Sequence, residues 1–298
     1  MNNLDKNMAA ASWLAAHEDL FRCPLCHAAM RIADGKSIIC GNGHCFDIAK
    51  QGYINFLTRK PETKYDKALF ASRKEIMDGG FFDPVDARIA EIIISSGPGR
   101  KAPSSLTLLD AGCGEGSHLA AVANRVRQTI TVPVAGLGID IAKEGVVLAA
   151  KRHHDLFFCV GNLADSPLAD GRYDCILNIL SPSNYAEFHR LLAEDGILIK
   201  AIPGPHYLQE LRSVIFGEGQ RRSYSNEKIE RRFAERFYVE DSSRLEYKVR
   251  LPKPMLEHLI TMTPLSWGAR DEQLQAVLAR EYLDVTIDMT VLAGRKRN

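Results

Sequence analysis

The sequence has no run of apolar residues that approaches the roughly 18 needed to cross a membrane. Its first 20 residues lack the basic start and apolar core of a secretory signal, and they include Asp5, Glu18 and Asp19. The formal net charge is only +1 over 298 residues, so contact with nucleic acid would have to come from local basic patches. These absences predict a cytoplasmic protein without a membrane partner.

Cysteine is scarce and unevenly placed, since four of the seven lie between positions 23 and 45. A reducing cytoplasm argues against a disulfide framework. Cys23 and Cys26 form one close pair, and Cys40 with His44 follows after 13 intervening residues. These four side chains predict a closed, tetrahedral and therefore structural zinc site. Cys45 is the alternative fourth ligand, but the glycines before His44 favour the histidine.

From Leu106 onward, short apolar runs alternate with segments of helix length. Strands that alternate with helices predict a mostly parallel sheet with helices on both faces. The sequence therefore predicts a doubly wound, Rossmann-like α/β domain. Its expected strands are 106–110, 134–140, 156–161, 173–179, 196–201, 241–251 and 286–293.

A glycine-rich turn follows the first of these strands. Asp110 ends the strand, and Gly112, Gly114 and Gly116 alternate with other residues before a helix that begins at Ser117. Glycines allow a tight turn and close approach to a ligand, and a helix N-terminus presents unpaired amides. A dinucleotide-binding turn would carry a third glycine where this chain has Ser117. The carboxylate of Asp110 suits an aminoacyl ammonium better than a pyrophosphate.

Two further strand ends narrow the identity of the ligand. Asp140 ends the second strand, where a carboxylate can accept hydrogen bonds from both ribose hydroxyls. Asn162 and Leu163 follow the third strand and are expected at the adenine. Each alone has an ordinary alternative, because Asp140 could cap a helix and Asn162 could form a turn. Together with the glycine turn they predict S-adenosylmethionine (SAM) as the ligand and methyl transfer as the reaction.

Several stretches together resemble the bacterial 23S ribosomal RNA (guanine-N(1))-methyltransferase family from about Phe21 to the C-terminus. The glycine turn is common among methyltransferases, but its combination with the cysteine pairs and a Met-Thr-Pro segment is far more specific. The stretches are Cys23–Cys26 with Cys40 and His44, Phe46–Lys50 with Gly52–Asn55, Leu108–Gly116, Pro203–Pro205 and Met262–Arg270.

The resemblance implies a class I SAM-dependent methyltransferase domain and a zinc-ribbon-like module that helps to recognise RNA. It also implies methylation of N1 of one guanine in a hairpin loop of 23S ribosomal RNA. In the cofactor pocket it implies roles for Gly114 and Glu115, and for the positions of Phe82 and Tyr207, where relatives can have Tyr and His. The expected organisation is an extension over 1–20, the zinc module over 21–58, a basic linker over 59–83 and the methyltransferase domain over 84–298.

Two basic segments could contact RNA. The segment 59–74 has six Lys or Arg against two acids, and 221–236 has six against three. Tyr53, Tyr65 and Tyr224 offer faces on which unpaired bases could stack. Such charge runs are usually solvated helix faces, so most of the weight for RNA comes from the resemblance. Whether the chain forms a homodimer is left open.

The catalytic residues are less well defined than the cofactor site. Asn178 and Ser181 follow the fourth strand, on the edge expected to face the substrate, and His206 is near the same edge. An ordinary loop explains these residues about equally well, and none stands out as a general base. Two other functions remain open: a methyltransferase that acts on a small molecule, and an inactive zinc-containing protein that binds RNA.

Overall fold

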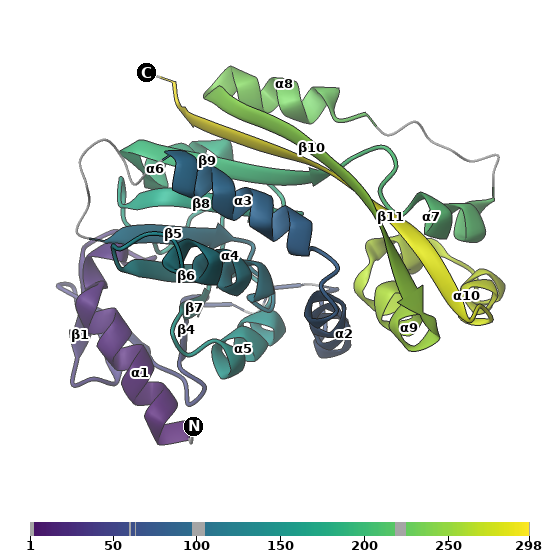
Figure 1. The fold of residues 1–298 in the computed structure, drawn as a ribbon. Coiled ribbons are helices and arrows are strands. Elements are labelled where there is room, and N and C mark those ends of the chain that lie inside the picture. Colours follow the sequence, from purple (N-terminus) through teal and green to yellow (C-terminus); the bar gives the residue numbers. More distant parts are fainter. Residues whose placement is uncertain (1–2, 60, 63, 97–104, 218–224, 298) are drawn as a thin grey trace.

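The computed structural model describes residues 3–59, 61–62, 64–96, 105–217 and 225–297, with side chains from Lys6 onward (Figure 1). Within these residues the main sheet has the strand order β10-β11-β9-β8-β5-β6-β7-β4. None of the helices in these ranges is long and apolar enough to cross a membrane.

The centre of the sheet is parallel and buried on both faces, as predicted. Neighbouring residues of β5 point into opposite hydrophobic clusters, Leu108 into one and Leu109 into the other. One face carries α3, α4 and α5, and the other carries α1, the zinc module and α6 (Figure 1). The parallel strands are β5 (Leu106–Ala111), β6 (Val134–Asp140), β7 (Phe157–Val160), β8 (Tyr173–Ile179) and β9 (Leu192–Pro203).

One helix precedes β5, and helices follow β5, β6 and β8. Because strand and helix alternate along the chain, the carboxyl ends of the parallel strands meet at one edge of the sheet. The candidate site lies at this edge. The helices are α3 (Asp83–Ser96), α4 (Ser117–Arg127), α5 (Lys143–Arg152) and α6 (Tyr185–Leu191).

The zinc module contributes a strand to the main sheet and does not form a separate unit. Its own three-stranded sheet contains β1 (Met30–Ala33), β2 (Ser37–Cys40) and β3 (Cys45–Asp47). The next strand, β4 (Tyr53–Asn55), pairs in parallel with β7. Tyr53 is consequently only 4% exposed and offers no face to an RNA base, in contrast to the expectation from the sequence.

Residues 3–20 pack against the same face of the sheet as the zinc module. They form α1 (Asn3–Ala16) and the short 3-10 helix η1 (Glu18–Leu20). The ring of Trp13 stacks on that of Phe157 with centroids 5.0 Å apart, and Leu14 is fully buried. The hydroxyl of Tyr173 donates to the carbonyl oxygen of Leu20 over 2.7 Å. This segment is thus part of the folded core, although it lies outside the family resemblance.

The segment 59–83, expected as a basic linker, contains helix α2 (Lys67–Asp78). Asp66 caps this helix by accepting a hydrogen bond from the Leu69 amide over 2.8 Å. Leu69, Phe70 and Ile76 are buried, and α2 packs against α5 and α9. The many charged residues of the segment concealed this apolar face in the sequence.

The C-terminal part completes the sheet with two long antiparallel strands, β10 (Phe237–Pro252) and β11 (Tyr282–Lys296). Most helices of this part lie at one end of the hairpin, where α9 packs on α2, whereas the helix that precedes β10 lies toward the other end (Figure 1). They form one side of the candidate site. These elements are α7 (Gln209–Phe216), α8 (Glu227–Arg236), α9 (Lys253–Met262), η3 (Pro264–Gly268) and α10 (Asp271–Leu278).

Candidate active site and metal centre

The turn after β5 requires its glycines. Gly112, Gly114 and Gly116 have φ values of +94°, +54° and +83°, a region that other residues rarely adopt. A Cβ atom at Gly112 would lie 2.0 Å from the Ser181 hydroxyl oxygen, and one at Gly116 would lie 2.8 Å from the Phe158 ring. The turn is therefore enclosed by packed neighbours on two sides.

Buried carboxylates surround a single imidazole beside this turn. Asp86, Asp110 and Glu115 are at most 2% exposed, and Asp86 Oδ1 lies 2.7 Å from His118 Nδ1. Burial raises the pKa of Asp110 to about 7; His118 opposes this rise, and the nearby carboxylates, including Asp140, add to it. Three acids with one imidazole give the pocket an excess of negative charge at neutral pH. A cationic ligand suits such a pocket.

Asp140, Asn162 and Leu163 lie at the ends of β6 and β7, as expected. The carboxylate of Asp140 accepts the amides of Gly114 and Ala142, each over 2.8 Å, and so fixes the glycine turn to β6. Asn162 is exposed, and its side-chain oxygen accepts the Ala164 amide over 2.9 Å. Both residues thus have structural contacts as well as a position suited to ribose and adenine.

A cavity of about 1230 Å³ begins at the glycine turn and extends toward β9 and the C-terminal helices. Phe82, Gly112, Glu115, Ser181 and Tyr207 are among its lining residues. The other predicted cofactor residues line the turn and the strand ends but not this cavity: Asp110, Gly114, Gly116, Asp140, Asn162 and Leu163. The cavity accordingly lies beside the turn and extends away from the ends of β6 and β7.

The residues present fit SAM on two observations. Gly112 lies in the cavity wall without a side chain, which permits close approach of a ligand to the backbone there. The surplus of buried carboxylates matches a donor that carries both an ammonium and a sulfonium group. One oxygen of Asp86, Oδ2, is buried without a hydrogen-bond partner among the described residues. An added donor in the pocket would relieve this cost.

Asn178 is buried at the end of β8 with its side chain fully engaged. Its amide nitrogen donates to the carbonyl oxygens of Ala111 and Pro182, both over 3.1 Å. Its oxygen accepts from the Ser183 hydroxyl over 2.8 Å and from Lys200 Nζ over 2.7 Å. These contacts hold the 180–183 loop against the cofactor turn. Ser181, in contrast, lines the cavity.

His206 lies outside the cavity lining, in a group of charged residues on β10 and β11. Its Nδ1 is 3.1 Å from Glu246 and 3.3 Å from Arg244, and its amide donates to Asp288 over 2.8 Å. Arg244 also forms two 2.8 Å hydrogen bonds to Asp288. The guanidinium of Arg244 binds both Asp288 and Glu246 and offsets part of their negative charge, so we describe the group as an ion-pair network.

Sequence reasoning missed two of the basic residues that line the cavity, Lys200 and Arg212. Lys200 lies in the buried strand β9, and a charged residue within that apolar run was the available signal. Of the two basic segments, 59–74 contributes Arg73 and 221–236 contributes Arg232 and Arg236. Tyr65 also lines the cavity, and its ring lies 5.7 Å from that of Trp267. Tyr224 lies outside the described residues.

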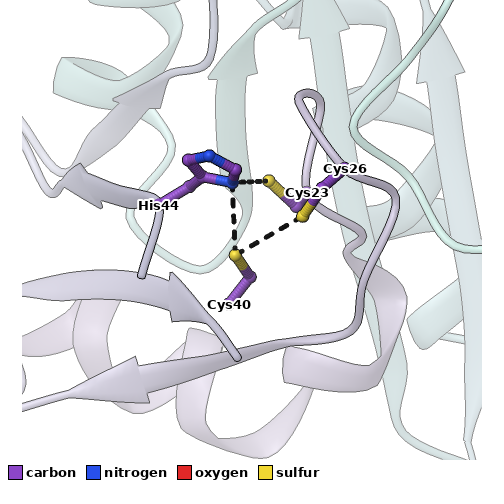
Figure 2. A group of neighbouring side chains, drawn as sticks. All are labelled: Cys23, Cys26, Cys40 and His44. Atoms are coloured by element: carbon purple, nitrogen blue, oxygen red, sulfur yellow. Dashed lines mark hydrogen bonds between the residues drawn. The ribbon is translucent and has the colours of Figure 1, made fainter. Parts of the chain in front are cut away.

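Three thiols and one imidazole converge in the zinc module (Figure 2). The sulfur and Nδ1 atoms of Cys23, Cys26, Cys40 and His44 all lie within 4.8 Å of one another. The Cys26–Cys40 sulfur distance is 3.7 Å, and Nδ1 of His44 is 3.4 Å from the sulfur of Cys23 and 3.5 Å from that of Cys40. A tetrahedron with zinc–sulfur bonds of about 2.3 Å has edges of about 3.8 Å. Cys45 is exposed on β3, outside this group.

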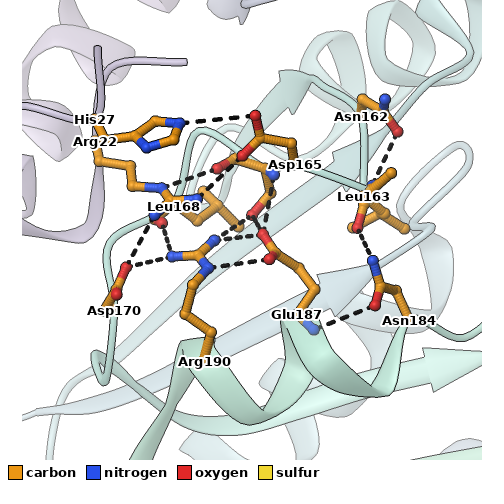
Figure 3. Close-up of polar contacts among 12 residues, drawn as sticks. Arg22, His27, Asn162, Leu163, Asp165, Leu168, Asp170, Asn184, Glu187 and Arg190 are labelled. Carbon is orange, nitrogen blue, oxygen red and sulfur yellow. Dashed lines mark hydrogen bonds and ion pairs between the residues drawn. The ribbon is translucent and has the colours of Figure 1, made fainter. Parts of the chain in front are cut away.

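The zinc module is joined to the loop that carries Asn162 and Leu163 (Figure 3). Arg22, next to the ligand Cys23, forms ion pairs with Asp165 over 3.1 Å and with Asp170 over 3.3 Å. From the other side, Arg190 on α6 pairs with Asp170 and donates to the carbonyl oxygen of Leu168 over 2.8 Å. We call this group the loop clamp.

Backbone contacts reinforce the loop clamp. The Arg22 amide donates to the carbonyl oxygen of Pro167 over 3.0 Å, and the Ala169 amide donates to that of Leu20 over 2.9 Å. Asn184 donates to the carbonyl oxygen of Leu163 over 3.2 Å. The loop that carries Asn162 and Leu163 is thus positioned partly by the zinc module.

Comparisons with known proteins agree with this geometry. A family model described as RlmA, N-terminal, matches residues 21–60, and one described as a methyltransferase domain matches 103–226. A Bacillus subtilis (strain 168) protein is 41% identical over 93% of this chain and 97% of its own length. Its provisional name is 23S rRNA (guanine-N(1)-)-methyltransferase YxjB.

A Streptomyces fradiae protein named 23S rRNA (guanine(748)-N(1))-methyltransferase is 31% identical over 92% of this chain and 96% of its own length. A Micromonospora griseorubida protein with a provisional name of the same kind is 30% identical over 94% and 99%. Because the similarity spans both the zinc module and the methyltransferase domain, this chain belongs to the 23S rRNA (guanine-N(1))-methyltransferase family.

Proposed function

We propose that this protein transfers a methyl group from SAM to N1 of a guanine in a hairpin loop of 23S ribosomal RNA. The observation that carries the proposal is the single cavity that joins the glycine turn to a wall containing Arg73, Arg212, Arg232 and Arg236. Arginines can bind the phosphates around a loop, while the cavity admits one base that leaves the stack. The full-length family relationship supports the same substrate.

The cofactor would bind along the edge formed by β5, β6 and β7. We infer that Asp110, with Glu115 nearby, faces the ammonium, that Asp140 binds the ribose, and that Asn162 and Leu163 receive the adenine. Gly112, Gly114 and Gly116 shape the turn, and Phe82 and Tyr207 line the methionine end. Bound SAM supplies an electrophilic methyl group on sulfonium. The chain supplies alignment of the guanine with that methyl group.

Zinc is the metal that best suits the three thiols and the imidazole of the N-terminal module. With four protein ligands it would stabilise the module and bind no substrate. We propose that the module, over 21–58, also contacts RNA near the cavity, and that 84–298 performs the transfer. Action on ribosomal RNA would place the protein in the cytoplasm. Whether the chain forms a homodimer is tested by sedimentation with and without RNA.

The function is tested with purified protein, radiolabelled SAM and a transcript of the 23S ribosomal RNA hairpin. Nuclease digestion and mass spectrometry should locate N1-methylguanosine in the loop. A transcript whose loop guanines are replaced by adenines is the matched control and should gain no label. Binding of SAM without transfer to any ribosomal RNA would contradict the proposal and would leave a small-molecule substrate as the second candidate.

A further inference from the structure

Lys200 is a buried lysine at the inner wall of the cavity. It is 4% exposed, and it lies on β9 beside Asn178 of β8 and Leu292 of β11. Its Nζ atom is 2.7 Å from Asn178 Oδ1 and 3.4 Å from the carbonyl oxygen of Ser181. Within the part of the chain that the structure describes, both partners are neutral oxygens. Such a site does not compensate an ammonium charge.

The position of Lys200 links the cofactor turn to the substrate space. Ser181, whose carbonyl Lys200 contacts, has its hydroxyl oxygen 2.0 Å from the place a Cβ would occupy on Gly112. Lys200, Ser181 and Gly112 all line the same cavity. The amine is therefore in the wall where the methyl donor would meet a base entering from the arginine side.

The surroundings make the neutral amine accessible near physiological pH, although the ammonium still predominates below about pH 8. Burial lowers the pKa of Lys200 from 10.5 to about 8. A neutral amine has two N–H donors and one lone pair. The two donors match the oxygens of Asn178 and Ser181, and this leaves the lone pair for a proton from another group. An ammonium would need a third acceptor.

Other ionisable groups of the cavity are less suited to this role. Glu115 is bound to the Ser117 amide over 3.0 Å, and His118 is paired with Asp86. Glu235 is exposed on α8. Burial raises the pKa of Tyr185 and Tyr207, so their hydroxyls stay protonated. The remaining charged groups on the lining are Arg73, Arg212, Arg232 and Arg236, which cannot accept a proton.

We propose that Lys200 is the general base that takes the proton from guanine N1 during methyl transfer. This inference rests on the proposed function and deepens it. As the N1–methyl bond forms, the sulfur–methyl bond breaks and its electron pair remains on sulfur. The N1 proton passes to the lone pair of Lys200 Nζ, and the resulting ammonium later releases it to water. No other reactant is needed.

The test measures single-turnover methylation of the RNA hairpin from about pH 6 to 10. In the unaltered protein the rate should rise tenfold per pH unit and level off near pH 8. Lys200→Met should lower the rate at pH 7.5 by about 100 to 10,000-fold, the usual contribution of a general base. Its residual rate should keep rising at alkaline pH, because guanine N1 then ionises by itself.

Calorimetric titration with S-adenosylhomocysteine provides a readout separate from activity. Affinity should stay within about twofold in Lys200→Met, since we place this lysine beside the base and not on the cofactor. Lys248→Met, on the exposed part of β10, is the matched control and should leave both rate and affinity unchanged. Lys200→Arg keeps a cation and its donors but not the base, so it should be as slow as Lys200→Met.

The outcomes separate the two proposals. Failure of the unaltered protein to methylate RNA overturns the proposed function. An active protein whose Lys200→Met variant keeps more than half the rate, or keeps the levelling near pH 8, overturns the role of Lys200. If Lys200→Met loses its fold or its affinity for the cofactor product, Lys200→Arg decides, and a wild-type pH profile in that variant overturns the inference.

Discussion

Burial opposes the ionisation of the Asp110 carboxyl group, whereas the ammonium group of its expected ligand would favour it. The Asp110 pKa of about 7 means that the carboxyl group is largely charged above neutral pH and largely neutral below it. An ammonium favours the charged form, so SAM binding should lower this pKa. By linkage, affinity must fall as the pH drops through 7.

We therefore expect the affinity for SAM to be nearly constant above about pH 8 and to weaken about tenfold per unit below pH 7. Calorimetric titration between pH 5.5 and 8.5 measures this. Asp110→Asn should bind more weakly at high pH and lose most of the dependence. Methylthioadenosine, which has no ammonium, is the control ligand. Equal pH dependence for both ligands would contradict a role of Asp110 at the ammonium.

The sequence predicted the features that depend on local backbone geometry. It missed the features that depend on contacts between distant parts of the chain. The alternating glycines of the turn were recognisable because φ values such as +94° at Gly112 need them. Tyr53 looked like a stacking platform, yet pairing of β4 with β7 buries it. Lys200 was overlooked because its contacts with Asn178 and Ser181 bring together two strands and a loop.

At the scale of the elements, the group Cys23, Cys26, Cys40 and His44 gives a clear prediction about which side chains bind zinc. Cys40→Ser should abolish stoichiometric zinc, whereas Cys45→Ser should retain it, because Cys45 is exposed outside the group of four. Metal analysis of the purified variants measures this. Zinc loss in Cys45→Ser, with zinc retained in His44→Ala, would show that Cys45 is the fourth ligand instead.

The loop clamp connects the zinc module to the adenine side of the cofactor site. Arg22→Met should weaken S-adenosylhomocysteine binding by about 1 kcal/mol, roughly fivefold, because partly buried ion pairs to Asp165 and Asp170 are lost. Hydrogen exchange of residues 162–170 should also accelerate. The control is Arg172→Met, which removes an exposed pair with Asp19 over 3.5 Å. Equal effects of both variants would argue against the clamp.

The predicted boundaries of the strands agree with the observed boundaries where the pattern of apolar residues is strong. The predicted strands 134–140 and 173–179 coincide with β6 and β8, whose residues are buried on both faces of the sheet. The segment 59–83 was expected to be a linker because its charges dominate the composition. Its helix α2 depends on packing against α9, nearly 200 residues away in the chain, which no local pattern reveals.

At the scale of the whole molecule, three separate parts of the chain surround one cavity. The β5 turn and α2 line the side where we propose that the cofactor binds, and β8 and β9 line the inner wall. Basic and apolar residues of α7, α8, α9 and η3 line the remaining side. The zinc module lies on the opposite face of the sheet from α4 and contributes β4 to the sheet (Figure 1). This arrangement agrees with the sequence-based fold class, although it makes the module and the catalytic domain one continuous structure.

The central claim is that this protein methylates N1 of a guanine in 23S ribosomal RNA. The most direct measurement is mass-spectrometric mapping of modified nucleotides in ribosomal RNA from cells with and without the gene. We predict that one N1-methylguanosine in a hairpin loop disappears from 23S ribosomal RNA in the deletion strain and returns when the gene is restored. An identical map in both strains would contradict the account.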